Sequence, residues 1–423
     1  MKLFINKYLL IDLLLLLFLL LFYLFGEIGS FYFGKILIII AISSSIQLIY
    51  RYKKSDFIVV FLIFGIMYWF YLLAYYFFEI PYHYLLEYQT IEYTNMVVIL
   101  QLSLLRIMFI GIGPNQISNP RQNIIYRNND IVFFLFSSIL IIMIAIILIM
   151  TPLNLSGDYS IETKSSSLLE YAIIFIIIAS VYAHSKYKQY FIIGLSSVYM
   201  LLPLLYGKRL AFLMISLLIF NLFFTGKFKL KYILIIAIIG FIFVRVFAGI
   251  RVGIENMNLL TFLLGVTDDG VMSNNHGGVV VCSVTYFGLI ENDIFNLIFR
   301  LKSLLGTVIG TILPASLNLE EAYVNLYAMK YTQIPGNGGL TSIYLYIWGG
   351  FIGIVFGGLI FNYLIRNPNN SRLIYIYLIF MFATYPRWYA YNMFILLKMG
   401  FWLMVFLAMA DTLHKYTKKG IIK

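Results

Sequence analysis

The chain has 423 residues, of which 62% are hydrophobic and only 11% are charged. Soluble domains carry about a quarter charged residues, so this composition excludes an ordinary water-soluble protein. The net charge of +12 lies mainly in short loops between apolar runs. Membrane topology explains such a pattern, and we expect no nucleic-acid partner. The single Cys282 excludes an internal disulfide and a cysteine metal cluster.

The apolar runs predict about twelve membrane-spanning helices, each near the length that crosses a bilayer. The first run lacks a small-residue cleavage site, so we predict a retained span rather than a signal peptide. The predicted spans are Tyr8–Phe25, Phe31–Tyr50, Phe57–Phe78, Asn95–Ile112, Ile131–Met150, Leu168–Ala183, Tyr190–Tyr206, Leu210–Thr225, Tyr232–Ile250, Thr341–Ile365, Leu373–Tyr385 and Asn392–Ala410. The eleventh is short, and it is predicted to continue through "PRWYA" as a broken helix. The fold class is therefore an all-α polytopic membrane protein.

Charge fixes the predicted orientation. Lys and Arg concentrate in alternate loops such as "RYKKSD" and "GKFKLK" and in the tail "HKYTKKGIIK", while the opposite loops carry Glu and Asp. The positive-inside rule then places both termini in the cytoplasm. It divides the chain into a bundle of about nine spans at 1–250, a large external loop at 251–340, and three last spans with a basic tail at 341–423.

The large loop contains helical signals of its own. Ile294, Ile298, Leu301 and Leu305 recur at helical spacing, which predicts an amphipathic helix with "END" as its N-cap. Such a helix would lie at the outer membrane surface or cover a cavity. The segment "GGVVVCSVTYFGLI" before it is apolar but short for a span. The alternative is that the two segments form an extra pair of spans.

Five cations break the charge rule. Lys208 and Arg209 occupy a short outer turn, while Arg245, Arg251 and Arg387 come to the same predicted face from three other segments. Cations in such positions are costly and are kept for a partner. Because guanidinium groups bind phosphates through two parallel hydrogen bonds, the set predicts a site for an anionic, membrane-held ligand. The alternative is that each cation pairs with a loop carboxylate or extends to lipid headgroups.

Other polar residues carry weaker signals. In "TDDGVMSNNHGG", Asp268, Asp269 and His276 are candidates for a general base near neutral pH, although tight turns also explain this composition. The other histidines are isolated, and no metal site is predicted. Asp12 and Arg106 lie toward the inner halves of their spans, where a structural ion pair is the simplest interpretation.

Glycine marks the return from the loop into the membrane. In "IPGNGGLTSIYLYIWGGFIGIVFGG", the first glycines permit close backbone approach and a sharp start to the span. The later ones include pairs four residues apart, which favour tight helix packing.

The order of these features resembles that of bacterial O-antigen polymerases, the Wzy-type oligosaccharide repeat-unit polymerases. It comprises "GKR" in a short outer turn, "R…AGIR" at the end of a span, a loop running from "DDG" to "ILP", then "GNGGLTSIYLYIWGGFIGI" and a late "PRWYAYN". The resemblance covers roughly residues 190–398, and the first half matches only as a series of spans.

The resemblance implies a glycosyltransferase of the GT-C type at the periplasmic face of the bacterial inner membrane. It would transfer a growing glycan from undecaprenyl pyrophosphate onto a new lipid-linked repeat unit, without metal or cofactor. Lys208, Arg209, Arg245, Arg251 and Arg387 would hold the pyrophosphate, and His276 or Asp269 would deprotonate the acceptor hydroxyl. Implied partners are undecaprenyl-pyrophosphate-linked glycans, membrane lipids, a chain-length regulator and a flippase.

Three other functions fit parts of the pattern. A lipid-linked oligosaccharide flippase would share the size and substrate charge, but we would expect two similar halves, which the sequence does not show. An O-antigen ligase would share the mechanism and differ in the acceptor. A structural or receptor-like membrane protein would need no external cation cluster.

Overall fold

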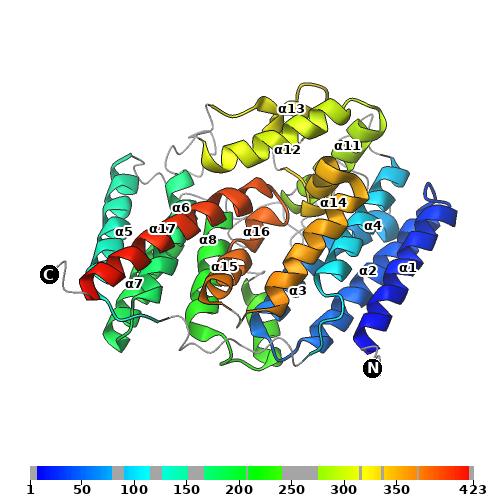
Figure 1. The fold of residues 1–423 in the computed structure, drawn as a ribbon. Coiled ribbons are helices and arrows are strands. Elements are labelled where there is room, and N and C mark those ends of the chain that lie inside the picture. Colours follow the sequence, from blue (N-terminus) through cyan, green and yellow to red (C-terminus); the bar gives the residue numbers. More distant parts are fainter. Residues whose placement is uncertain are drawn as a thin grey trace, which may run out of the picture. The chain divides into compact units, whose positions relative to one another are not determined.

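The computed structural model describes residues 7–78, 90–114, 126–150, 166–205, 208–240, 275–313, 317–334, 338–368 and 371–418. For a few helical residues, among them Arg209 and His276, only the backbone is described. Every regular element within these ranges is a helix (Figure 1). This is the expected architecture for a chain in lipid, because a helix satisfies its own backbone hydrogen bonds.

Helices lie where the sequence predicts spans. Those in the first half are α1 (Lys7–Phe25), α2 (Phe31–Arg51), α3 (Asp56–Phe78), α4 (Ile91–Met108), α5 (Asp130–Met150), α6 (Ser166–Val181) and α7 (Lys186–Leu205). They are followed by α8 (Arg209–Ile219) with the π-helical turn η2 (Phe220–Phe224), a helix at Leu230–Gly240, α14 (Thr341–Arg366), α15 (Arg372–Ala383) and α17 (Phe394–Lys418). The remainder of the predicted ninth span, 241–250, lies outside the described residues.

Seven of the described helices are long and apolar enough to cross a membrane: α1, α2, α3, α4, α5, α14 and α17. Shorter apolar helices include α6, α15 and α11 (Asn275–Glu291). The chain is therefore a multi-pass helical membrane protein by length and composition. The predicted break after the eleventh span is confirmed, because α15 ends at Ala383 and the short helix α16 (Tyr385–Trp388) follows it.

The chain divides into two compact units. Unit 1 comprises Met1–Ser118, Phe228–Arg366 and Trp388–Phe394, and unit 2 comprises Asn119–Lys227, Asn367–Arg387 and Ile395–Lys423. Each unit is thus assembled from segments that are distant in sequence. Unit 1 contains α1–α4 and the helices from α11 to α14, whereas unit 2 contains α5–α8, α15 and nearly all of α16 and α17.

Glycines allow α14 to pack tightly in unit 1. A Cβ added to Gly358 would lie 2.6 Å from Cγ2 of Ile107 in α4, so only glycine permits this approach. A Cβ on Gly357 would meet Leu345, in an earlier turn of α14 itself, at 2.7 Å. The predicted role in close helix packing is confirmed for Gly358, whereas Gly357 packs within α14.

The helix α14 is interrupted, and an arginine side chain donates hydrogen bonds to the backbone carbonyls at the interruption. Gly350 has φ 59° and ψ −146°, a conformation that side chains with a Cβ rarely adopt, and it interrupts the helical backbone. Two carbonyls just before the break accept hydrogen bonds from a side chain. Arg300, from α12 (Leu297–Ile312), supplies them: its Nε donates to the Ile347 carbonyl at 2.7 Å and its Nη2 to the Tyr346 carbonyl at 3.0 Å.

The amphipathic helix predicted in the large loop is present as α12. Its N-cap is Asn296, whose side-chain oxygen accepts from the Phe299 amide at 3.0 Å, so the expected cap at "END" is wrong by a few residues. Ser303 and Thr307 on its inner face are buried. Its opposite face exposes an apolar stripe of Leu297, Ile298, Leu301, Leu304, Leu305, Val308 and Ile312.

The segment "NHGG" is helical rather than a series of turns, because α11 begins at Asn275. Val279, Val280 and Val281 in the next turn are fully buried. Burial of this apolar run against α3, α4 and α14 stabilises the helix, which extends back through the polar residues before it. Figure 1 shows α12 and the short helix α13 (Val324–Ala328) lying across one end of unit 1.

Unit 2 is built on neighbouring helix pairs. α5 packs on α6, α7 packs on α8, and α15 contacts both α6 and α8. Phe175 of α6 and Phe406 of α17 lie with ring centroids 5.3 Å apart. Ser371 caps α15 through a hydrogen bond from the Leu373 amide to its hydroxyl. These contacts pack α6, α8, α15 and α17 together within the unit.

Candidate anion-binding site

Two of the predicted cations act on one carboxylate in unit 2. Arg387 Nε lies 3.6 Å from Oε2 of Glu170, which is in the second turn of α6. Lys208 also acts electrostatically on Glu170, without forming an ion pair within 4 Å in the described part of the chain. Arg387 and Lys208 are far apart in sequence, and the fold brings them to the same end of α6.

Local sequence positions each of these side chains. Lys208 is the N-cap of α8, and its amide donates to the carbonyl of Pro203 in α7 at 2.6 Å. Arg387 lies in α16, the short helix after the break that ends α15, and its amide donates to the Thr384 carbonyl at 2.9 Å. Lys208 thus lies at the start of α8, and Arg387 lies in the one-turn helix α16.

The coordination of Arg387 is incomplete. Its Nε makes no hydrogen bond to any described residue, although the atom is buried. A charge-assisted hydrogen bond is typically 2.7–2.9 Å long, so the 3.6 Å contact with Glu170 is an ion pair without a hydrogen bond. The Arg387 side chain is 31% exposed and the Glu170 side chain 18% exposed. Arg387 therefore keeps most of its donor capacity for a ligand.

The other predicted site residues are only partly placed. Arg209 begins α8, directly after Lys208, but its side chain is not described. His276 lies in the first turn of α11, and again only its backbone is described. Arg245, Arg251 and Asp269 lie outside the described residues. The structure therefore brings together Lys208 and Arg387 from the predicted set.

Glu170 was missed by the sequence reasoning, which considered the loop acids and Asp12 but not this acid within the predicted sixth span. A signal was available, because Glu170 stands alone among apolar residues in "SSLLEYAIIFIIIASV". Ionisable residues inside membrane helices mark functional or paired positions.

A second charged cluster of unit 2 lies at the opposite end of α6. Asp411 of α17 accepts from Arg372 Nη1 at 2.8 and 2.9 Å, from Arg127 Nη1 at 2.8 Å and from the Tyr182 hydroxyl at 2.6 Å. These residues belong to segments that the charge pattern assigned to the cytoplasmic face. The contacts bring those segments to a common end of the unit, separated from Glu170 by the length of α6.

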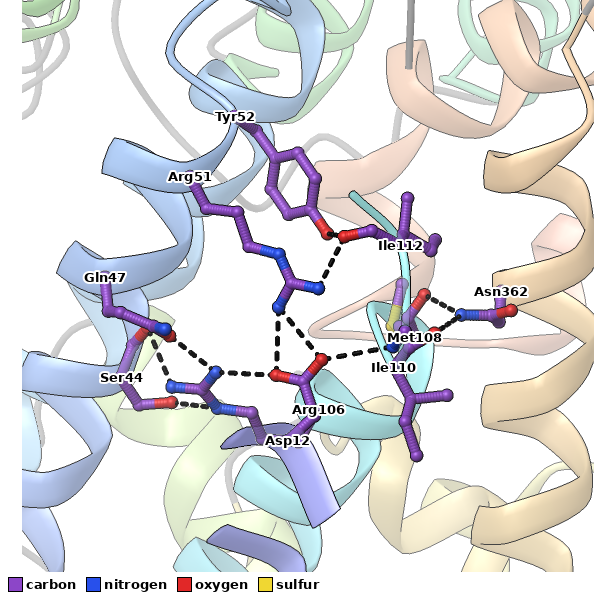
Figure 2. Close-up of polar contacts among 11 residues, drawn as sticks. Asp12, Ser44, Gln47, Arg51, Tyr52, Arg106, Met108, Ile110, Ile112 and Asn362 are labelled. Carbon is purple, nitrogen blue, oxygen red and sulfur yellow. Dashed lines mark hydrogen bonds and ion pairs between the residues drawn. The ribbon is translucent and has the colours of Figure 1, made fainter. Parts of the chain in front are cut away.

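Unit 1 holds a third cluster, and it is fully buried. Figure 2 shows the carboxylate of Asp12 between two guanidinium groups. Arg51 Nη1 donates to both Asp12 oxygens at 3.0 and 2.9 Å, and Arg106 Nη1 donates to Oδ1 at 3.3 Å. The three side chains are at most 2% exposed. The predicted ion pair between Asp12 and Arg106 is therefore confirmed, and Arg51 joins it.

Neutral oxygens complete this third cluster. Arg106 donates through Nε to the Ser44 hydroxyl, through Nη1 to Gln47 Oε1 at 2.7 Å and through Nη2 to the Ser44 carbonyl at 3.2 Å. The Ile112 carbonyl accepts from Arg51 Nη2 and from the Tyr52 hydroxyl (Figure 2). Within the described residues, Arg51 Nε is the one guanidinium nitrogen of the cluster without a hydrogen bond. The cluster is a structural tie between α1, α2 and α4.

The glycine and aromatic motifs dock against one another in unit 1. The Thr341 amide donates to the Tyr389 carbonyl at 2.9 Å, and its hydroxyl donates to the Trp388 carbonyl at 2.7 Å. A Cβ on Gly338, which has φ +80°, would lie 1.9 Å from the Tyr391 carbonyl oxygen, so glycine is required. These bonds fix the chain directly after Arg387.

Metal-binding geometry is absent from the described ranges: no three His, Cys, Asp or Glu side chains come close enough together to hold an ion. Comparison of the chain with protein-family models, with curated proteins and with solved structures finds no match.

Proposed function

We propose that the chain is a lipid-linked oligosaccharide polymerase, a glycosyltransferase that joins undecaprenyl-pyrophosphate-linked repeat units at the periplasmic face of the bacterial inner membrane. The observation that carries the proposal is the convergence of Lys208 and Arg387 on Glu170. These are two of the cations that the charge rule does not explain, and they come from distant segments of a multi-pass membrane protein.

The coordination of Arg387 supports an anionic ligand. One carboxylate faces two cations, so the group carries a formal charge of +1. Unlike Arg51, Arg387 makes no hydrogen bond to its carboxylate. A diphosphate offers oxygens that fit the planar guanidinium and carries enough negative charge to displace a weakly held carboxylate. The order of motifs in the sequence, described above, selects a lipid-linked diphosphate among such ligands.

In the proposed reaction, a hydroxyl of the incoming repeat unit attacks the anomeric carbon of the growing glycan. The bond between that carbon and the pyrophosphate oxygen breaks, and the carrier diphosphate leaves. Arg387, Lys208 and, by the resemblance, Arg209, Arg245 and Arg251 would neutralise the charge that develops on the leaving group. His276 or Asp269 would accept the hydroxyl proton. No metal is required in this scheme.

Surface glycan length in a strain that lacks the gene tests the function. We expect the ladder of polymer lengths to collapse to a single repeat unit on the lipid anchor. Loss of all exported units would identify a flippase, and polymer stranded on the carrier would identify a ligase. An unchanged ladder would exclude all three.

Complementation then tests the site. Wild-type protein should restore the ladder, whereas Arg387→Ala should not. Lys188→Ala is the matched control, because Lys188 is a cation of unit 2 that pairs with Asp130 near the other end of α6. Equal expression of both variants in the membrane must accompany the comparison. Full restoration by Arg387→Ala would contradict the proposed role of the site.

A further inference from the structure

Glu170 has a position that the proposed reaction does not explain. It lies in an apolar helix, its side chain is 18% exposed, and both cations of the site act on it. A carboxylate next to a phosphate site repels the ligand, which makes it unfavourable for binding. Its presence therefore requires a separate physical reason.

The geometry around Glu170 supplies one. Without an anion, Arg387 and Lys208 would be two like charges in a poorly hydrated site, which is costly. The carboxylate compensates part of that charge. At 3.6 Å and without a hydrogen bond, it does so loosely, in contrast to the bidentate contact at 2.9–3.0 Å between Arg51 and Asp12. A loose counter-ion stabilises the empty site and leaves the guanidinium donors available.

We propose that Glu170 is the resident counter-ion of the anion site, holding Arg387 and Lys208 until a diphosphate takes its place at the guanidinium. In this role Glu170 lowers the affinity for the diphosphate and thereby favours its release after turnover. The inference rests on the proposed function for the identity of the ligand as a polyprenyl diphosphate. It does not depend on the identity of the general base.

Diphosphate affinity of Glu170→Gln tests this role. The full chain is purified in nanodiscs of phosphatidylcholine, whose neutral headgroups do not compete, and is titrated with inorganic pyrophosphate and with farnesyl diphosphate. We expect Glu170→Gln to bind both probes roughly two- to fivefold more tightly than wild type, the range for loss of one partly exposed ion pair. Adding Arg387→Met should abolish the gain.

Controls separate the role from general effects. Asp130→Asn removes an acid of the same unit at its other end and should leave the affinity unchanged. Glu170→Asp retains the charge on a shorter side chain and should show a smaller gain, which keeps the test available if Glu170→Gln does not fold. Unchanged or weaker binding by these folded Glu170 variants overturns the proposal. If Glu170 were instead the general base, its variants would bind diphosphate with unchanged affinity and would lose the polymer.

Two further comparisons distinguish a lipid-linked diphosphate from a lipid headgroup as the ligand of the site. A larger gain for farnesyl diphosphate than for pyrophosphate supports a lipid-linked ligand. If nanodiscs containing phosphatidylglycerol abolish the gain for both probes, the site takes lipid headgroups, and the polyprenyl part of the proposal fails. The two proposals fail separately: an unchanged glycan ladder in the deletion strain contradicts the polymerase function, while tighter binding by Glu170→Gln would still establish the counter-ion.

Discussion

The Asp12 cluster of unit 1 and the Glu170 cluster of unit 2 contain the same charges, one carboxylate and two cations, and yet differ in coordination. Asp12 accepts two hydrogen bonds from Arg51 and one from Arg106, and neutral oxygens take up other guanidinium donors. Glu170 faces Arg387 at 3.6 Å without a hydrogen bond. Completed coordination indicates a structural tie, and incomplete coordination indicates capacity for a ligand.

The Asp411 cluster lies between these two cases. It also combines one carboxylate with two cations, Arg127 and Arg372, and its hydrogen bonds are short. Its members are nevertheless partly exposed, from 12% for Arg372 to 34% for Arg127. If burial and hydrogen bonding decide the role of a cluster, removing one acid from each should affect stability in the order Asp12, Asp411, Glu170.

The largest loss of stability is expected for Asp12→Ala. It leaves two buried guanidinium groups without a carboxylate, and breaking a buried ion pair in this way costs about 3–5 kcal/mol. Thermal unfolding of the purified protein in nanodiscs measures the effect. Asp130→Asn is the control, with an expected change below about 0.5 kcal/mol, because Asp130 is 65% exposed. Equal effects of the two substitutions would contradict the structural role of the Asp12 cluster.

Asp411→Asn should have an intermediate effect. Hydrogen bonds to charged groups contribute about 1.5–3 kcal/mol, and partial exposure of this cluster places the loss toward the lower end. The same unfolding measurement applies. A loss as large as that of Asp12→Ala would show that burial does not set the order of the clusters.

Arg300→Met tests whether a guanidinium that donates only to backbone carbonyls stabilises the fold. The substitution leaves the Tyr346 and Ile347 carbonyls at the break in α14 without their side-chain donor, and we expect a loss of about 1–3 kcal/mol. Lys302→Met, two residues away on the same helix, removes an exposed cation and is the matched control. Indistinguishable melting temperatures would mean that water satisfies those carbonyls.

The smallest effect on stability is expected for Arg387→Met, below about 1 kcal/mol, because its ion pair is long and partly exposed. Its effect on function should be large, with loss of the glycan ladder in a complemented deletion strain. Normal stability together with absent activity would separate the Glu170 cluster from the structural clusters most clearly. A destabilisation comparable with Asp12→Ala would place Arg387 among the structural cations.

Much of the fold could be predicted from the sequence. The helices begin and end within a few residues of the predicted spans for most of the chain, as for α2 at Phe31 and α14 at Thr341. Long apolar runs dictate helices in lipid, so this part follows from local sequence. The break in α14 at Gly350 was not predicted, because glycine fits helix packing and a broken backbone equally well in sequence.

The candidate site was predicted in part. Lys208 and Arg387 were selected by charge; the structure pairs Arg387 with Glu170, and Lys208 acts electrostatically on the same carboxylate. Glu170 itself, Arg51 in the Asp12 cluster and Arg300 at the break were not identified. A charge at a helix end has several explanations in sequence, and its actual partner depends on which helices become neighbours.

The sequence by itself determined that this is a multi-pass helical protein with cations in unexpected turns, because hydropathy and charge are properties of each segment alone. Tertiary structure decided which cations are bound by the protein and which remain available. Arg51 and Arg106 meet Asp12 with their hydrogen bonds nearly complete, whereas Arg387 meets Glu170 at a distance that leaves its donors unused. That difference arises from the packing of helices distant in sequence, which no local pattern encodes.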